Sequence, residues 1–134
     1  MSNISSVAVI GLGYIGLPTA AILADQGLRV HGVDVNPSTV EAVNAGCVPF
    51  VEPELGEYVA RNVQAGRLTA TVETPAADAY IVAVPTPFLE NKTPDLSYIE
   101  TAGRTLAAQL SGDELIILES TSPPGATDRL AEVI

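Results

Sequence analysis

The stretch from Val7 to Asp34 constrains the fold of this chain more than any other. It contains an apolar strand, a glycine-rich turn, a helix and a second strand, which we place at Val7–Ile10, Gly11–Gly16, about Tyr14 to Gln26, and Arg29–Val33. A strand that is apolar throughout is typical of a parallel sheet covered on both faces. Gly27 directly follows the helix, where a glycine commonly ends one. We therefore expect two parallel strands joined by a right-handed helical crossover.

The glycine spacing in the turn indicates a dinucleotide site. Gly11 permits a tight turn, Gly13 lets the backbone approach a pyrophosphate, and Gly16 allows helix and strand to pack closely. The pyrophosphate would lie at the N-terminus of the helix, where N–H groups and the helix dipole favour anions. Asp34 stands 21 residues after Gly13 and is placed to accept hydrogen bonds from ribose hydroxyls. Because a carboxylate repels a 2′-phosphate, the sequence predicts NAD rather than NADP.

The same stretch has two alternative interpretations. Residues Val7 to Ala24 form an 18-residue run without a charge, which is long enough for a membrane span or a signal peptide. However, three glycines and Pro18 interrupt the run, no basic residue precedes it and no cleavage-site pattern follows it. A glycine-rich turn that binds no ligand is the second alternative. The acid at the end of the next strand favours the dinucleotide turn over both.

Acidic residues outnumber basic residues by 16 to 6, which gives a formal net charge of −10. Such a balance argues against nonspecific binding to nucleic acid or to an anionic membrane. Any anionic ligand must therefore be held by local donors, such as a helix N-terminus. With 134 residues, of which 47% are hydrophobic, the chain is long enough for one domain with its own core.

The chain has one cysteine, Cys47, and one histidine, His31. A single cysteine excludes an intrachain disulfide and fits a reducing compartment, so we expect a cytoplasmic protein. Two such residues are too few for a cluster of metal ligands, and we predict no metal site. Cys47 has no partner base in view and His31 lies within a strand, so neither is favoured as a catalytic residue.

Strands and helices alternate through the rest of the chain. Asn36 and Pro37 have the pattern of an N-cap and a first helical residue, and Ser97 with Glu100 has the pattern of a capping box. The expected elements are a helix from Asn36-Pro37 to Gly46, a helix from Pro53 to Gly66, strands at Leu68–Val72, Tyr80–Val84 and Leu115–Leu118, and a helix with the inner face Ile99, Ala102, Leu106 and Leu110. This alternation predicts an α/β fold with a doubly wound parallel sheet, Rossmann-like, in the strand order 3-2-1-4-5.

The second half of that sheet lacks a sixth strand, because the chain reaches Ile134 in or just after a helix that follows Pro123-Pro124-Gly125. We therefore expect residues 1–134 to form one NAD-binding domain, a fragment of a longer protein. The fifth strand is then an open apolar edge.

Ligands of such sheets lie beyond the carboxyl ends of the strands. Thr86 and Thr121 end neighbouring strands there and are candidates to contact the nicotinamide half of a dinucleotide or a bound water, with ordinary turn residues as the alternative. Glu119 is a candidate for acid–base chemistry, although a carboxylate hydrogen-bonded by nearby N–H groups is favoured. Asp25 is interpreted as a solvated helix residue and Arg29 as a charge at a strand start.

Four motifs together carry a more specific resemblance. GLGYIGLP (Gly11–Pro18), VEPEL (Val51–Leu55), AVPTPF (Ala83–Phe88) and ESTSPPGAT (Glu119–Thr127) resemble, in family order, the UDP-glucose/GDP-mannose dehydrogenase family. The similarity runs from about Val7 to Ile134. Within the family, VEPEL, AVPTPF and ESTSP look most like the UDP-N-acetyl-D-mannosamine dehydrogenases, whereas UDP-glucose dehydrogenases more often have EPGL and ST(V)PxGT patterns.

The resemblance implies oxidation of the C6 alcohol of a UDP-sugar to a carboxylate with two NAD⁺, through an aldehyde and a cysteine thioester, in polysaccharide biosynthesis. Gly11, Gly13, Tyr14, Ile15 and Gly16 match the pyrophosphate turn, and Asp34 matches the ribose acid. Thr86 matches a cofactor contact, and Thr121 a threonine near the nicotinamide that helps to hold the reactive water.

Two departures from the family pattern stand out. Thr39 occupies a position where many relatives have lysine or arginine, and the catalytic Cys, Lys and Asp of the family would lie beyond Ile134. Cys47 does not match the catalytic thiol. We therefore expect this chain alone to bind NAD weakly and to oxidise nothing, while the full-length protein would act on a UDP-sugar as a homodimer.

Other functions stay open at this point. The sugar could be UDP-glucose or UDP-N-acetylglucosamine, and the chain could be a non-catalytic NAD-binding module. A 3-hydroxyacid or 6-phosphogluconate dehydrogenase shares the GLG turn, but VPTPF and ESTSPPG count against this class.

Overall fold

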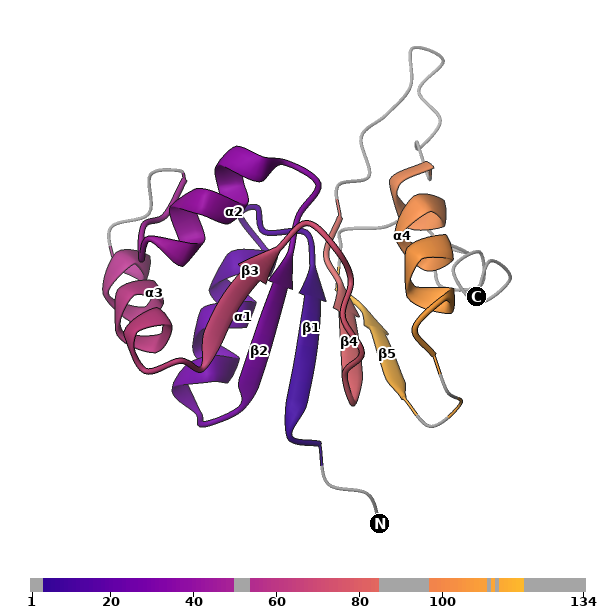
Figure 1. Ribbon diagram of the computed structural model, residues 1–134, viewed down its shortest axis with the longest axis horizontal. Helices are drawn as coiled ribbons and strands as arrows, with labels where there is room; N and C mark the ends of the chain where they lie inside the picture. Colours follow the sequence, from indigo (N-terminus) through magenta and orange to yellow (C-terminus); the bar gives the residue numbers. More distant parts are fainter. Residues whose placement is uncertain (1–3, 50–53, 85–96, 111, 113, 120–134) are drawn as a thin grey trace.

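The computed structural model describes residues 4–49, 54–84, 97–110, 112 and 114–119. Its centre is a parallel five-stranded sheet in the order β3-β2-β1-β4-β5, as predicted (Figure 1). The strands are β1 (Ser6–Ile10), β2 (Arg29–Val33), β3 (Leu68–Thr71), β4 (Ala79–Val82) and β5 (Leu115–Leu118). In the register Ile10 pairs with both Val33 and Val82. The carboxyl ends of the central strands are therefore level, which creates one edge on which a ligand can lie.

Helices cover the two faces of the sheet unequally (Figure 1). The helices are α1 (Gly16–Asp25), α2 (Pro37–Asn44), α3 (Leu55–Gln64) and α4 (Ser97–Ala107). Helix α1 begins two residues later than the expected Tyr14, because Tyr14 and Ile15 still belong to the turn. Three predicted strands differ by one or two residues at their ends: β1 begins at Ser6, β3 stops at Thr71, and β4 spans Ala79–Val82. Asn36 caps α2 as expected, since its side chain accepts a hydrogen bond from the Ser38 N–H at 3.0 Å.

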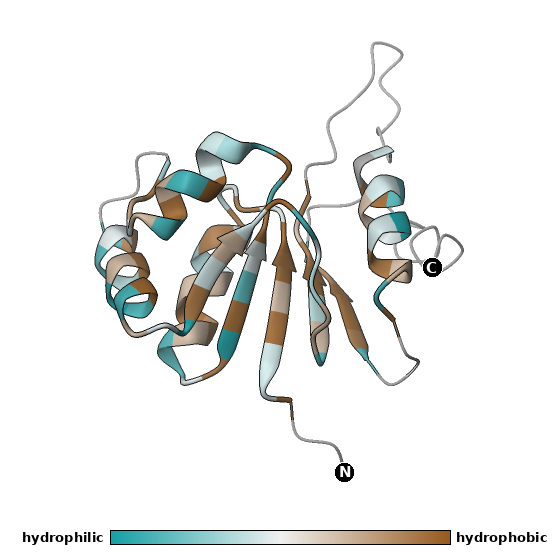
Figure 2. Cartoon of the chain, in the orientation of Figure 1, coloured by the Kyte–Doolittle hydropathy of each residue, from teal (hydrophilic) through white to brown (hydrophobic). Residues whose placement is uncertain are grey.

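Alternate residues of each central strand enter two separate hydrophobic cores. Val7 and Val9 of β1 face the core that contains α1 and α3, whereas Ala8 and Ile10 face the core that contains α4. This burial on both faces explains why β1 is apolar throughout. In Figure 2, hydrophobic colours predominate along β1 and β5, β2 alternates between hydrophobic and hydrophilic colours, and the outer sides of α2 and α3 are largely hydrophilic. The predicted inner face of α4 is confirmed, with Ile99, Ala102 and Leu106 buried and Leu110 packed beside them.

Strand β5 is the last strand of the described sheet. Leu115 and Ile117 are 49% and 42% exposed on the face that α1 covers elsewhere, while Ile116 and Leu118 pack toward α4. The expected apolar edge is thus present in the described residues. The helix predicted after Gly125 lies outside them, as do the VEPEL residues Val51–Pro53. Within the described residues, no helix has the length and apolar character needed to cross a membrane.

Asn44 protects the opposite edge of the sheet. Its side-chain amide donates a hydrogen bond to the Ala70 carbonyl at 2.9 Å and accepts one from the Ala70 N–H at 2.8 Å. The amide of Asn44, the last residue of α2, therefore pairs with β3 as a neighbouring strand would. An unprotected edge presents unpaired backbone groups to other chains, so this contact both anchors α2 and covers part of β3.

We expect Asn44→Ala to lower the free energy of unfolding by about 1–2 kcal/mol, because two hydrogen bonds to the edge strand are lost. Urea denaturation followed by circular dichroism measures the change. Gln64→Ala, which removes an exposed amide from the last residue of α3, is the matched control and should cost less than about 0.5 kcal/mol. Equal losses in the two variants would contradict a role for Asn44 at the edge.

Candidate functional site

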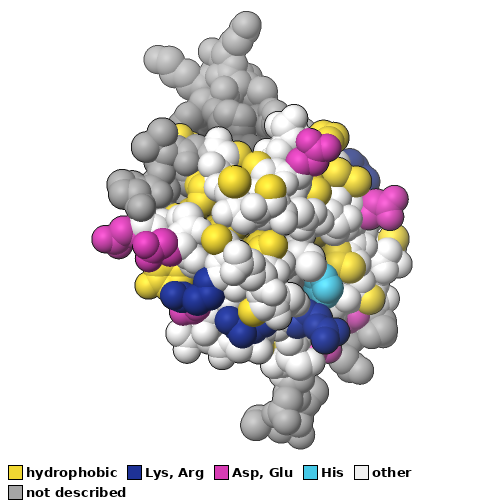
Figure 3. All heavy atoms as spheres, turned by 60° about the vertical axis from the view of Figure 1, so that its left-hand side comes forward, with side chains coloured by type: hydrophobic (Ala, Val, Ile, Leu, Met, Phe, Trp, Pro, Cys, Tyr) yellow, Lys and Arg dark blue, Asp and Glu magenta, His cyan; other side chains and the backbone are white. Residues whose placement is uncertain are grey.

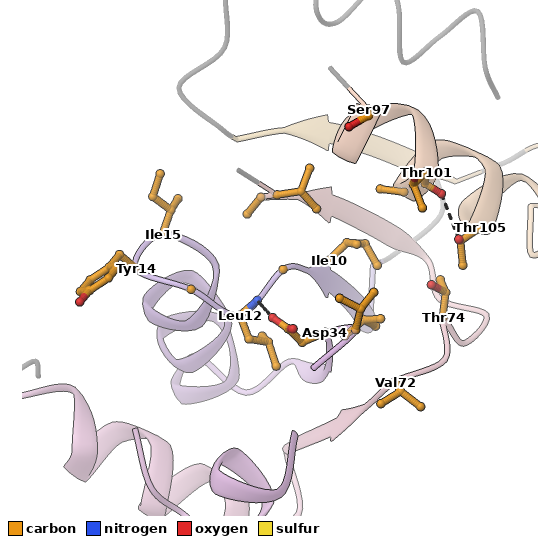
Figure 4. A pocket seen from close by; sticks show the side chains of 17 residues that line it. Ile10, Leu12, Tyr14, Ile15, Asp34, Val72, Thr74, Ser97, Thr101 and Thr105 are labelled. Carbon is orange, nitrogen blue, oxygen red and sulfur yellow. Dashed lines mark hydrogen bonds between the residues drawn. The ribbon is translucent and has the colours of Figure 1, made fainter. Parts of the chain in front are cut away.

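A cleft of about 920 Å³ opens at the carboxyl ends of β1, β2 and β4. One side is formed by the glycine turn and by the residues that follow β2 and β3, and the other by the end of β4 and by α4 (Figure 4). Its position follows from the strand order, because the helical connections leave β1 toward α1 and β4 toward α4 and so diverge there. Ligands of open parallel sheets bind in this crevice.

The three glycines of the turn have different surroundings. Gly11 has φ +98°, and a Cβ atom there would lie 2.7 Å from the carbonyl oxygen of Ala83. A Cβ atom on Gly16 would overlap the carbonyl oxygen of Gly11 and lie 3.3 Å from the Cβ of Ala83. Gly13 has no protein atom within 4 Å of such a Cβ. The protein itself thus requires Gly11 and Gly16, whereas the lack of a side chain at Gly13 leaves space beside the cleft for a ligand.

The N-terminus of α1 has the character of an anion site. Ile15 occupies the N-cap position and makes no side-chain cap hydrogen bond, and the first turn of the helix contains no acidic residue. The first N–H groups of a helix need partners, and the helix dipole favours a negative charge there. No Lys or Arg side chain is found among the described residues that line the cleft. An anion in this cleft would therefore be held by the backbone of the turn and by α1. This arrangement fits the pyrophosphate of a dinucleotide.

Asp34 is half-buried and is held by backbone donors on both carboxylate oxygens. The Leu12 N–H donates to Oδ2 at 2.9 Å (Figure 4), and the Asn36 N–H donates to Oδ1 at 2.9 Å. Each carboxylate oxygen can accept a further hydrogen bond, so the group is oriented and still able to bind hydroxyls. Because Leu12 belongs to the glycine turn, the same contact fixes the turn relative to the end of β2.

The walls of the cleft are mostly apolar. Val35 is 86% exposed, Tyr14 72% and Val72 48%, and all three line the cleft. Apolar walls of this kind suit an aromatic ring system. Helix α4 contributes hydroxyl groups from Ser97, Thr101 and Thr105, with the Thr105 hydroxyl donating to the Thr101 carbonyl at 3.0 Å.

The hydroxyl stripe on α4 was not recognised from the sequence, although a signal was present. Ser97, Thr101 and Thr105 recur every four residues and so lie on one side of the helix, next to the predicted inner face. Thr74, buried in the connection between β3 and β4, also lines the cleft. Tyr80 anchors this connection, since its hydroxyl donates to the Pro75 carbonyl and accepts from the Ala77 N–H, both at 3.0 Å.

The structure brings most of the predicted site residues together. Gly11, Gly13, Tyr14, Ile15 and Asp34 all line the cleft, with Gly16 directly behind the turn. Thr86 and Thr121 lie outside the described residues, so their contacts with a cofactor stay predictions. Thr39 lies in the first turn of α2 and does not line the cleft.

Two polar residues have partners that the sequence interpretation did not anticipate. The carboxylate of Glu119 accepts a hydrogen bond from the hydroxyl of Thr19 at 2.5 Å, rather than from nearby N–H groups. Asp25 is more than a solvated helix residue, because it pairs with Arg61 of α3 at 2.7 Å. The hydrogen bond from Arg61 is the main cause that lowers the pKa of Asp25. Both contacts join segments far apart in the sequence, so local patterns could not reveal them.

Cys47 and His31 lie away from the cleft. Cys47 is exposed, and its nearest hydrogen-bond partner is the carbonyl oxygen of Ala45, 3.9 Å from Sγ. His31 is half-buried in β2, with Nδ1 3.5 Å from the Thr69 hydroxyl. Figure 3 shows the histidine at the surface, in the same lower part of this face as several Lys and Arg side chains. In the described residues, no group of three or more His, Cys, Asp or Glu side chains could hold a metal ion.

Comparison with known proteins gives a consistent result. A sequence model of the UDP-glucose/GDP-mannose dehydrogenase family, NAD binding domain, matches residues 5–134. An NDP-N-acetyl-D-galactosaminuronic acid dehydrogenase of Ralstonia nicotianae is 52% identical over 95% of this chain and 30% of its own length. A UDP-N-acetyl-D-mannosamine dehydrogenase of Yersinia pestis is 47% identical over 97% of this chain and 31% of its own length. The chain thus spans about a third of the length of these relatives.

Solved structures agree with the sequence relatives. The UDP-D-ManNAc dehydrogenase of Pyrococcus horikoshii matches 96% of this chain and 31% of its own, with a TM-score of 0.90 and 37% identity. A ternary complex of GDP-mannose dehydrogenase from Pseudomonas aeruginosa matches 92% of this chain and 30% of its own, with a TM-score of 0.87 and 31% identity.

We expect the only histidine of the chain to titrate below pH 6.5 in the folded state. Burial, followed by the nearby positive charge of Arg29, lowers the pKa of His31. The unfolded chain then takes up a proton at a higher pH than the folded chain, so stability falls as the pH drops below about 6.5. Proton NMR of the imidazole resonances measures the folded pKa. Urea denaturation at pH 7.5 and 5.5 should show that His31→Gln loses less stability at the lower pH than the unchanged chain does. A histidine pKa at or above 6.5 would contradict the prediction.

Proposed function

Since the chain belongs to the UDP-glucose/GDP-mannose dehydrogenase family as an NAD-binding domain, we propose that it is the cofactor-binding part of a UDP-sugar 6-dehydrogenase. The observation that carries the proposal is the geometry of the turn: Gly13 leaves space at the uncapped N-terminus of α1, and Asp34 is fixed beside it. The enzyme would oxidise the C6 alcohol of the sugar to a carboxylate, and NAD supplies the acceptor for the hydride in each of two oxidations.

Different residues of the cleft would bind different parts of the cofactor. Asp34 would accept hydrogen bonds from the adenosine ribose, and the backbone of Gly11–Gly16 would hold the pyrophosphate. The apolar side chains of Val35 and Val72 would flank the adenosine end. Thr86 and Thr121 would lie on the nicotinamide side, where Thr121 would help to hold a water. The chemistry at the thiol requires residues from the remaining length of the relatives, so the chain alone should form no NADH from a UDP-sugar.

The proposed substrate is UDP-N-acetyl-D-mannosamine, because VEPEL, AVPTPF and ESTSP resemble that branch and relatives with this name are 46–48% identical. The Ralstonia relative at 52% identity favours an NDP-N-acetyl-D-galactosamine sugar as a second candidate. Either sugar would serve polysaccharide biosynthesis in the cytoplasm, and the full-length enzyme would be a homodimer. Both candidates use the same cofactor half, so the tests below hold for each.

Asp34→Ala should weaken NAD binding by about 10- to 100-fold, because hydrogen bonds to a charged acceptor are worth about 1.5–3 kcal/mol and every 1.4 kcal/mol is tenfold. The unchanged chain should bind NADP at least about 10-fold more weakly than NAD, since Asp34 repels the 2′-phosphate. Isothermal titration calorimetry measures both. Glu41→Ala, at an exposed position of α2, controls for the change in net charge and should leave NAD affinity unchanged. Equal affinities for NAD and NADP would overturn the assignment.

Gly13→Ala should reduce NAD affinity by about 10-fold or more while leaving the free energy of unfolding within about 0.5 kcal/mol of the unchanged chain. The added Cβ meets no protein atom and would occupy space reserved for the pyrophosphate. Gly56→Ala in α3 is the matched control, since its Cβ also meets nothing within 4 Å and the position is remote from the cleft. Full NAD affinity in Gly13→Ala would show that the ligand does not approach the turn.

A further inference from the structure

Glu119 is joined to the helix behind the cleft. Its N–H donates to the Val82 carbonyl at 2.9 Å and so continues the pairing of β4 with β5. Its Oε1 accepts the hydrogen bond from the Thr19 hydroxyl at 2.5 Å, in a partly buried position. Thr19 lies one turn into α1, and the two residues are 100 positions apart in the sequence. The bond therefore fixes the place of a negative charge relative to the turn.

The register of the sheet places Glu119 next to a residue that lines the cleft, although Glu119 does not line it itself. Val82 pairs with Leu118, so the next residues, Ala83 and Glu119, stand opposite each other. Ala83 lines the cleft and approaches the first turn of α1 at Gly16. Asp34 follows β2, which lies on the other side of β1. Asp34 thus lines the cleft on one side of β1, whereas Glu119 stands on the other side and behind the cleft, with its carboxylate bonded to α1.

We propose that Glu119, held by Thr19, makes the site prefer oxidised over reduced cofactor. This inference rests on the proposed function, because an adenosine ribose at Asp34 directs the nicotinamide end toward β4 and β5. The nicotinamide ring of NAD⁺ carries a positive charge that NADH lacks. A carboxylate fixed behind this end of the cleft stabilises the cation through space more than the neutral ring.

Two further observations favour this role. No Lys or Arg side chain is among the described residues that line the cleft, so none of these residues offsets the carboxylate. Repulsion between Glu119 and the pyrophosphate is the same for NAD⁺ and NADH, and it cancels from the ratio of their affinities. In a reaction that uses two NAD⁺ in succession, such a preference would favour the exchange of NADH for fresh NAD⁺.

Glu119→Gln tests the proposal, since glutamine keeps the volume and the acceptor for Thr19 but removes the charge. Affinities for NAD⁺, NADH and ADP-ribose are measured by calorimetry with the 134-residue chain at 0.15 M salt. The ratio Kd(NADH)/Kd(NAD⁺) should fall by about 3- to 10-fold, which is the scale of one charge interaction in a partly screened site. ADP-ribose, which has no nicotinamide, should bind at least as well as before.

Three further variants separate charge from structure. Thr19→Val keeps the carboxylate of Glu119 but removes the hydrogen bond that holds it, so the ratio Kd(NADH)/Kd(NAD⁺) should change by a smaller factor. Thr19→Ser keeps the hydroxyl and should retain the original ratio. Glu41→Gln removes a charge at a position that does not line the cleft and should also leave the ratio unchanged. The thermal midpoint of each variant checks that it is folded.

An unchanged ratio in Glu119→Gln, or an equal loss for all three ligands, would overturn the proposal while the proposed function stands. If the unchanged chain binds neither NAD⁺ nor ADP-ribose, the proposed function falls and this inference falls with it.

Discussion

The close approach of α1 to the sheet is the constraint on which the rest of the structure depends. The first turn of the helix comes so near to Gly11 and Ala83 that no side chain fits at position 16. Leu12 anchors the turn in the core, since its side chain is fully buried. It packs against Gly32 of β2, where an added Cβ would lie 2.9 Å from the methyl groups of Leu12. The absence of side chains at Gly16 and Gly32 thus lets α1 begin close to the carboxyl ends of the strands. As a result, the N-terminus of α1 borders the cleft.

The same approach explains how an acidic domain can hold an anionic ligand. The chain has a net charge of −10, and no basic side chain lines the described cleft. The attraction must therefore come from backbone dipoles, which a helix provides only at its terminus. Asp34 contributes to this arrangement as well as to specificity, because its bond to the Leu12 N–H holds the turn while its side chain also lines the cleft.

Much of the fold could be predicted because its signals are local. Apolar strands, the glycine after α1 and the Asn36-Pro37 cap are each recognisable within a few residues, and the crossover rule then orders the strands. Gly11, Gly13 and Asp34, which the sequence singles out, all line the cleft. The contacts missed by sequence reasoning join distant segments: Asn44 with Ala70, Asp25 with Arg61, and Thr19 with Glu119. The local sequence around an Asn, Asp or Glu does not reveal the distant partner that the fold brings to its side chain.

The sequence by itself determined the class of sheet, its strand order and the kind of ligand the turn can accept, because hydrophobic periodicity and glycine sterics act over short distances. Only the tertiary structure decided which residues face one another across the cleft. The stripe of Ser97, Thr101 and Thr105 becomes a wall because α4 packs on the opposite face of the sheet from α1. Glu119 becomes a fixed charge because the register places the end of β5 against the helix that begins at Gly16. Such pairings depend on packing between elements far apart in the chain, and so they exist only once the sheet is assembled.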